Sequence, residues 1–69
     1  MSDSTYKIIE LVGTSTDSWE KAAKNAVETA GKNLKNLRVA EITKLDMKVE
    51  DNKISAFRAR VALSFKYED

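Results

Sequence analysis

The chain has 69 residues, of which 42% are hydrophobic and 33% are charged; its formal net charge is +1, and it lacks cysteine and histidine. A chain this short buries only about 60% of the surface that it exposes when unfolded, which allows one domain and one small core. The composition excludes disulfides, thiolate metal sites and the commonest general base, and it argues against a nucleic-acid partner.

The first five residues are polar and acidic, whereas a signal peptide begins with a basic segment followed by an apolar one. No apolar run approaches the roughly 20 residues that a membrane span needs. We therefore expect a cytoplasmic protein with no membrane partner. We interpret residues 1–69 as a single domain, with a flexible N-terminus at residues 1–4.

The first predicted element is a strand over residues 6–12, which are rich in β-branched and aromatic side chains. We expect Gly13 to end it. A run of N-cap residues follows, in which Ser15 is the first choice and Asp17 with Glu20 forms an alternative capping box.

Residues 15–35 predict one amphipathic helix, because apolar side chains recur there at three- and four-residue intervals. Charged residues occupy the opposite side. The apolar stripe is rich in alanine, so we expect the neighbouring element to approach it closely, with Trp19 in the core. The stripe consists of Trp19, Ala23, Ala26, Val27, Ala30, Leu34 and Leu37.

Residues 37–49 alternate with period two and predict a long strand, which a turn at 50–53 joins to a second alternating run. In the final run the odd-numbered positions 57–67 form the predicted core side. In the first strand of this hairpin, one predicted face carries Val39, Thr43, Leu45, Met47 and Val49, and the other carries Arg38, Lys44, Asp46 and Lys48.

The order strand, helix, strand, strand predicts an α+β fold. If the sheet is wholly antiparallel, the third strand must lie between the other two. We therefore predict a β-α-β-β fold, in which a three-stranded antiparallel sheet of order 1-3-2 packs on one amphipathic helix.

The predicted lengths do not match. A helix of about 20 residues spans roughly 30 Å, whereas hairpin strands of about 13 residues span roughly 43 Å. One helix cannot cover that sheet, so apolar residues such as Leu45, Met47 and Val49 need shelter from another subunit. Small size favours the same conclusion, and we expect a homo-oligomer.

Several segments together resemble the dodecin family over residues 5–67. They are Gly13-Thr14-Ser15, the alanine-rich run from Ala22 to Ala26, Val39-Ala40-Glu41 and the closing run from Val61 to Phe65. The resemblance implies a hollow homododecamer of dodecin-like subunits, which stores a small ligand, commonly a flavin such as riboflavin or FMN.

The flavin position differs from the family pattern. The resemblance places Val39 where flavin-binding dodecins have a stacking tryptophan, and Arg58 where they have a glutamine that hydrogen-bonds the flavin ring. Valine has no π-face, and arginine offers donors only. Flavin binding is therefore the less favoured interpretation. Other segments look like the calcium-dodecin branch, namely Ser18-Trp19-Glu20, Arg38-Val39-Ala40, Asp46-Met47 and Ser64-Phe65-Lys66.

Three acidic residues near the hairpin turn, Asp46, Glu50 and Asp51, offer the oxygen ligands that calcium accepts. They lack EF-hand spacing, and six to eight oxygens would have to come from several chains. The alternative interpretation is that Asp51 with Asn52 serves the turn alone.

Arg58 and Arg60 lie on one face of the predicted central strand. Arg58 could clamp a phosphate or carboxylate. Alternatively, both arginines form cross-strand or inter-subunit ion pairs with Glu10, Glu41 or Asp46. No acid-base constellation favours an enzyme. The sequence thus predicts a dodecin-like homododecamer that binds or stores a small ligand or an ion such as calcium. Retained flavin binding and a purely structural assembly are the alternatives.

Overall fold

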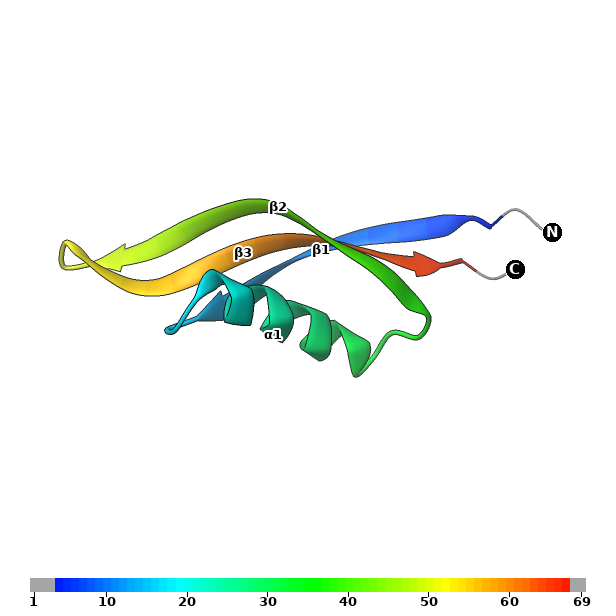
Figure 1. The fold of residues 1–69 in the computed structure, drawn as a ribbon, viewed down its shortest axis with the longest axis horizontal. Coiled ribbons are helices and arrows are strands. Elements are labelled where there is room, and N and C mark those ends of the chain that lie inside the picture. Colours follow the sequence, from blue (N-terminus) through cyan, green and yellow to red (C-terminus); the bar gives the residue numbers. More distant parts are fainter. Residues whose placement is uncertain (1–3, 68–69) are drawn as a thin grey trace.

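The computed structural model describes residues 4–67, so the expectation of flexibility at residues 1–3 lies outside the described residues. Four elements follow one another: β1 (Tyr6–Ser15), α1 (Trp19–Gly31), β2 (Leu37–Glu50) and β3 (Lys53–Lys66). The strands form one antiparallel sheet of order β1-β3-β2, and α1 lies along one side of it (Figure 1). The predicted β-α-β-β fold and strand order are confirmed.

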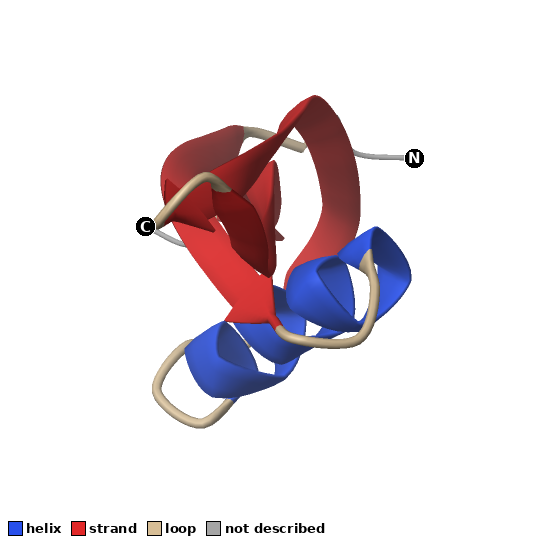
Figure 2. Cartoon of the chain, turned by 90° about the vertical axis from the view of Figure 1, so that its left-hand side faces the viewer, coloured by secondary structure: helices blue, strands red, loops and turns tan. Residues whose placement is uncertain are grey.

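The sheet has two faces, because successive side chains along a strand point to opposite sides. Residues directly opposite each other on antiparallel strands point to the same side. The twisted sheet curls over the helix (Figure 2). We call the face toward α1 the inner face; on β3 it carries Phe57, Ala59, Val61, Leu63 and Phe65. The outer face carries Ala56, Arg58, Arg60, Ala62, Ser64 and Lys66 of β3 with their partners on β1 and β2.

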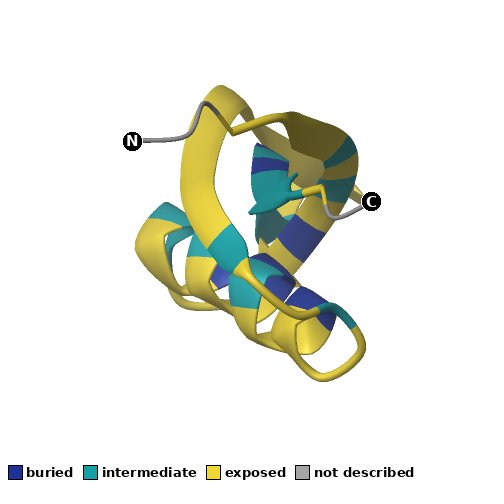
Figure 3. Ribbon diagram, turned by 90° about the vertical axis from the view of Figure 1, so that its right-hand side faces the viewer, coloured by how far each residue is buried: buried dark blue, intermediate teal, exposed yellow. Residues whose placement is uncertain are grey.

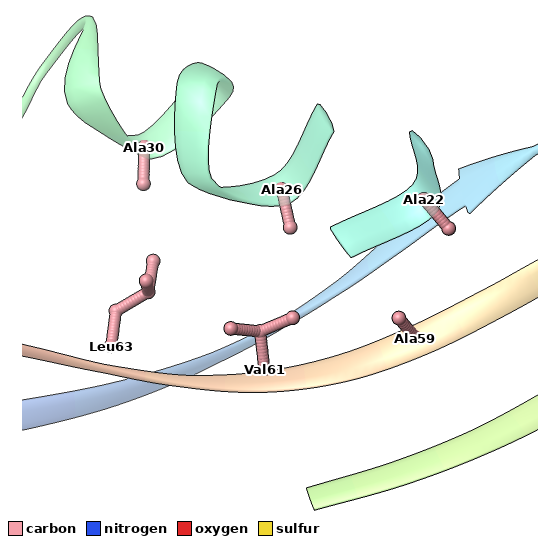
Figure 4. Close-up of a cluster of buried hydrophobic side chains, with 6 residues drawn as sticks. All are labelled: Ala22, Ala26, Ala30, Ala59, Val61 and Leu63. Atoms are coloured by element: carbon pink, nitrogen blue, oxygen red, sulfur yellow. The ribbon is translucent and has the colours of Figure 1, made fainter. Parts of the chain in front are cut away.

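The core is small and lies where α1 crosses β3. Three alanines of the helix pack on three inner-face residues of the central strand (Figure 4). The buried positions gather at this contact, while most of the rest of the chain is exposed (Figure 3). Among residues 4–67 the six buried hydrophobic residues are Ala22, Ala26, Ala30, Ala59, Val61 and Leu63. The predicted core side of the last strand is confirmed at Ala59, Val61 and Leu63, but it is wrong at Tyr67, which lies beyond the strand and is 53% exposed. The alanines let the backbones approach closely.

The first strand continues through Gly13 to Ser15 instead of ending at the glycine as predicted. Gly13 pairs with Ala59 inside the sheet. A Cβ at position 13 would collide with the carbonyl oxygen of Ala22 and lie 2.9 Å from the Cβ of Ala26. Glycine is present here because the helix backbone passes directly over the strand, and not because the chain turns.

The helix is shorter than the predicted 15–35, and its N-cap is Ser18 rather than Ser15 or Asp17. Ser18 is extended, with φ −165°, and its hydroxyl accepts a hydrogen bond from the Lys21 amide at 3.1 Å. The hydroxyl of Ser15 instead accepts from the Asp17 amide at 3.0 Å and so shapes the turn before the helix. Beyond Gly31 the chain leaves the helix and reaches Asn36 at φ 65°.

Three irregularities of β2 change the predicted faces. Its register with β3 shifts between Leu37 and Val39, between Ile42 and Lys44, and between Lys48 and Val49. A bulge shifts the alternation of side chains between the faces. Val39 therefore lies opposite Ser64 on the outer face, whereas Leu45 lies opposite Ala59 on the inner face. The prediction that Val39 and Leu45 share a face is wrong for this reason.

The hairpin turns at Asp51 and Asn52, both with positive φ (52° and 62°), as in the two-residue turns that match strand twist. The hairpin extends past the start of α1 (Figure 1). Its large apolar residues Leu45, Met47, Val49 and Ile54 are 43% to 60% exposed. The expectation that one helix leaves this end of the sheet uncovered is confirmed for the single chain.

Candidate functional site

The best-defined polar contact of the described chain joins Arg58 of β3 to Asp46, its direct partner on β2. Arg58 Nε donates to Asp46 Oδ1 at 2.6 Å, and Arg58 Nη2 donates to Asp46 Oδ2 at 2.8 Å. This is the two-pronged geometry in which guanidinium and carboxylate match best. Both side chains lie on the outer face and remain open to solvent, with 42% and 51% exposure.

The pair shifts the pKa of both partners. The hydrogen bond from Arg58 holds the pKa of the Asp46 carboxyl below its usual value, and the charges of Arg58 and Arg60 act in the same direction. The hydrogen bond to Asp46, with its charge, raises the pKa of the Arg58 guanidinium. Asp46 is therefore an ionised acceptor whose two oxygens are already engaged.

Asp46 is also held from the other side of the sheet. The indole Nε1 of Trp19 donates to the Asp46 carbonyl at 2.9 Å, and the Trp19 ring meets the Phe57 ring edge-to-face at a centroid distance of 5.1 Å. The prediction that Trp19 lies in the core is wrong, because Trp19 is only partly buried. Sequence reasoning missed this contact, since nothing in the helical spacing of Trp19 indicates a partner on β2.

Val39 and Arg58 do not meet within one chain. They are the two residues that the family resemblance places at the flavin position. Both lie on the outer face, but Val39 is opposite Ser64, six residues along β3 from Arg58. At about 3.3 Å per residue, this separates them by roughly 20 Å. Val39 is 60% exposed. A site that used both positions would have to draw them from different subunits.

The three acidic residues of the predicted ion site are also spread along the hairpin. Glu50 lies opposite Lys53 at the end of β2, and Asp51 begins the turn. Asp46, four residues before Glu50, is engaged by Arg58. Among residues 4–67, no group of three or more Asp or Glu side chains is placed to hold a metal ion. A calcium site on these residues would need further ligands from neighbouring chains.

An open cavity of about 430 Å³ lies between β1 and the helix. Asn25 spans it, with its Nδ2 donating to the Thr14 carbonyl at 3.0 Å. Thr29 and Val12 complete much of its wall. Sequence reasoning did not single out these residues. No charged side chain lines this cavity.

The described residues 4–67 include no helix of the length and apolar character that a membrane span requires.

Comparison with known proteins agrees with the fold. Residues 5–68 match the family model described as Dodecin. A calcium dodecin from Mycobacterium tuberculosis (strain ATCC 25618 / H37Rv) is 40% identical over 63 residues, which cover 91% of this chain and 89% of that protein.

Solved structures agree as well. The structure of dodecin from Streptomyces coelicolor superposes with a TM-score of 0.91 at 35% identity and covers 100% of this chain and 99% of its own. The crystal structure of the calcium-chelating antigen calcium dodecin from Mycobacterium tuberculosis has a TM-score of 0.83 at 41% identity, covering 94% and 93% of the two chains. By family model, relatives and fold alike, this chain belongs to the dodecin family.

Proposed function

We propose that this chain is a subunit of a homo-oligomer, a dodecamer as the family resemblance implies, that binds and stores a small ligand or ion without changing it chemically. The observation that carries this proposal is the exposure of ten large hydrophobic residues among residues 4–67, each at least 43% exposed in the single chain. Monomeric proteins rarely leave so much apolar surface open, so copies of the chain are its natural cover. Lack of histidine and cysteine supports binding rather than catalysis.

Calcium is the ligand that we propose. A calcium dodecin is 40% identical over 91% of this chain, and the carboxylates of Glu50 and Asp51 project at the exposed hairpin tip. Calcium takes six to eight oxygens, which several tips brought together by assembly could supply. Against a flavin stand the missing ring at Val39 and the engagement of Arg58 by Asp46.

Light scattering coupled to gel filtration tests the assembly. We expect a mass near twelve subunits; a monomer at micromolar concentration would contradict the proposal.

Calorimetric titration with calcium tests the ligand. We expect stoichiometric binding with a rise in melting temperature that grows with free calcium. Glu50→Gln with Asp51→Asn should abolish binding without loss of the fold, because asparagine tolerates the positive φ of position 51. Glu28→Gln on the helix is the matched control and should bind calcium as the wild type does.

Riboflavin fluorescence tests the less favoured ligand. Strong stoichiometric quenching by the protein would show that a flavin site survives despite Val39 and Arg58. An assembled protein that responds to neither calcium nor riboflavin would instead be a purely structural shell.

A further inference from the structure

Besides the Asp46–Arg58 pair, the outer face of the sheet carries two adjacent rows of opposite charge. One row crosses the sheet as Val12, Arg60 and Lys44, and the next crosses it as Glu10, Ala62 and Glu41. Arg60 and Ala62 are two residues apart on β3, so the rows are separated by roughly 7 Å. We call them the basic row and the acidic row.

The basic row contains two positive charges that face each other on neighbouring strands. Lys44 lies directly across from Arg60, an arrangement that destabilises a strand pair when no anion intervenes. Asp46 is the nearest carboxylate along β2, and Arg58 already takes both of its oxygens. Neither Lys44 nor Arg60 forms a salt bridge with any residue in the described range 4–67.

The bulge at Thr43 creates this opposition. Without the register shift between Ile42 and Lys44, the alternation of β2 would place Lys44 on the inner face. The Thr43 hydroxyl donates to the Arg60 carbonyl at 3.3 Å and joins the bulge to the central strand. A bulge can re-aim a side chain in this way.

The acidic row has the complementary form. Glu10 and Glu41 stand on the two outer strands on either side of Ala62, whose methyl group leaves a gap between them. Both glutamates are exposed, and neither has an ion pair within residues 4–67. The gap is open to a long cationic side chain that approaches the face from outside.

We infer that the outer face docks on the outer face of a second copy, with the basic row of each copy on the acidic row of the other. A two-fold axis that lies in the interface, runs across the strands and passes between the two rows exchanges them. Arg60 of the second copy then faces Ala62 between the two glutamates, and its Lys44 faces Glu41. A two-fold axis along the strands would instead set each row on its own sign.

Apolar residues around the rows suit a protein surface as the occupant rather than a free anion. Ile8, Val12 and Val39 interrupt the charges and are 48% to 64% exposed. The same two-fold axis sets Val39 against the Asp46–Arg58 pair of the second copy. The inference rests on the self-association proposed above. It places Val39 of one copy and Arg58 of the other at the same interface.

Charge reversal tests the pairing of the rows. Lys44→Glu with Arg60→Glu makes both rows acidic, and Glu10→Lys with Glu41→Lys makes both rows basic. We expect each double variant alone to lose the high-mass species in light scattering at low salt. Mixed in equal amounts, the two variants should recover it, and so should the quadruple variant that exchanges the rows within one chain.

Controls separate this result from misfolding and from failure of the assembly itself. Lys24→Glu with Lys32→Glu makes the same charge change on the exposed side of the helix and at its C-cap, and it should leave the mass unaltered. Circular dichroism checks each fold. Double variants that assemble as the wild type does, or a mixture that stays dissociated, would overturn the paired rows while the oligomer stands. A wild type that is itself monomeric would overturn both.

Discussion

Of the two glycines, Gly13 is the one with no room for a side chain. Its neighbour is the backbone of the helix, which cannot swing aside as a flexible side chain does. Gly31 differs, because a Cβ there would meet only Leu37 Cδ1 at 3.8 Å. Two glycines of similar appearance in the sequence therefore have opposite roles.

Gly13→Ala should lower the free energy of unfolding by about 1–3 kcal/mol, the usual cost of overpacking. Gly31→Ala should raise it by about 0.5–1 kcal/mol, because alanine favours the helix. Urea denaturation at matched protein concentration measures both. Equal effects of the two substitutions would contradict the close approach at Gly13.

Asp46 gives stability a defined dependence on pH. Its folded-state pKa is lowered chiefly by the Arg58 hydrogen bond. The pair therefore stabilises the fold fully above the unfolded pKa of about 3.9, and this contribution is lost as pH falls from there through the lowered folded value.

Thermal melts of the wild type and Asp46→Asn between pH 7 and pH 2 test this contribution. The variant should melt lower at neutral pH, and the difference should shrink as the pH falls below about 4. Arg58→Met, which removes the other partner, should show the same loss of pH dependence. A difference that persists unchanged at pH 2 would assign the stability to something other than the pair.

The helix start shows what sequence spacing can and cannot fix. Ser15, Asp17 and Ser18 are all good caps by residue type, and the choice among them depends on where β1 ends. Because the strand continues to Ser15, that residue cannot also be the cap. The hydroxyl of Ser18 is then the one in reach of the Lys21 amide.

Ser18→Ala should therefore cost about 1 kcal/mol of stability. Thr16→Ala, an exposed neighbour in the same turn, should have little effect. Chemical denaturation monitored by circular dichroism compares the two. A larger loss from Thr16→Ala would contradict the assignment of the cap.

The strands were predictable in number, order and approximate extent, because alternation and the hairpin turn are local signals. The faces of β2 were not. A bulge inserts one residue without any strong mark in the sequence, so Val39 could not be placed relative to Leu45 by counting. The Asp46–Arg58 pair was foreseen only as one of several ion pairs, since the register decides which carboxylate Arg58 meets.

The whole chain is elongated, with extents of 53 × 20 × 15 Å, and its core is confined to six residues. Such a core is small for independent stability. The hairpin residues that extend past the helix add exposed apolar surface, which we propose another copy covers. Folding and association are thus expected to be coupled.

Dilution tests this coupling. The melting temperature should fall as protein concentration is lowered, since association stabilises the folded state by mass action. Leu45→Glu with Val49→Glu should reduce the assembled mass, whereas Lys21→Glu, on the exposed side of the helix, should not. A melting temperature independent of concentration would contradict coupled folding.

The hydrogen bond between the single tryptophan and the Asp46 carbonyl makes Trp19 an intrinsic fluorescent probe of this contact. Indole emission depends on the polarity around the ring, and this ring sits at the joint between the helix start and the long hairpin. Loosening of the hairpin should move the emission to longer wavelength before helical ellipticity is lost. Unlabelled protein can therefore report when that joint opens.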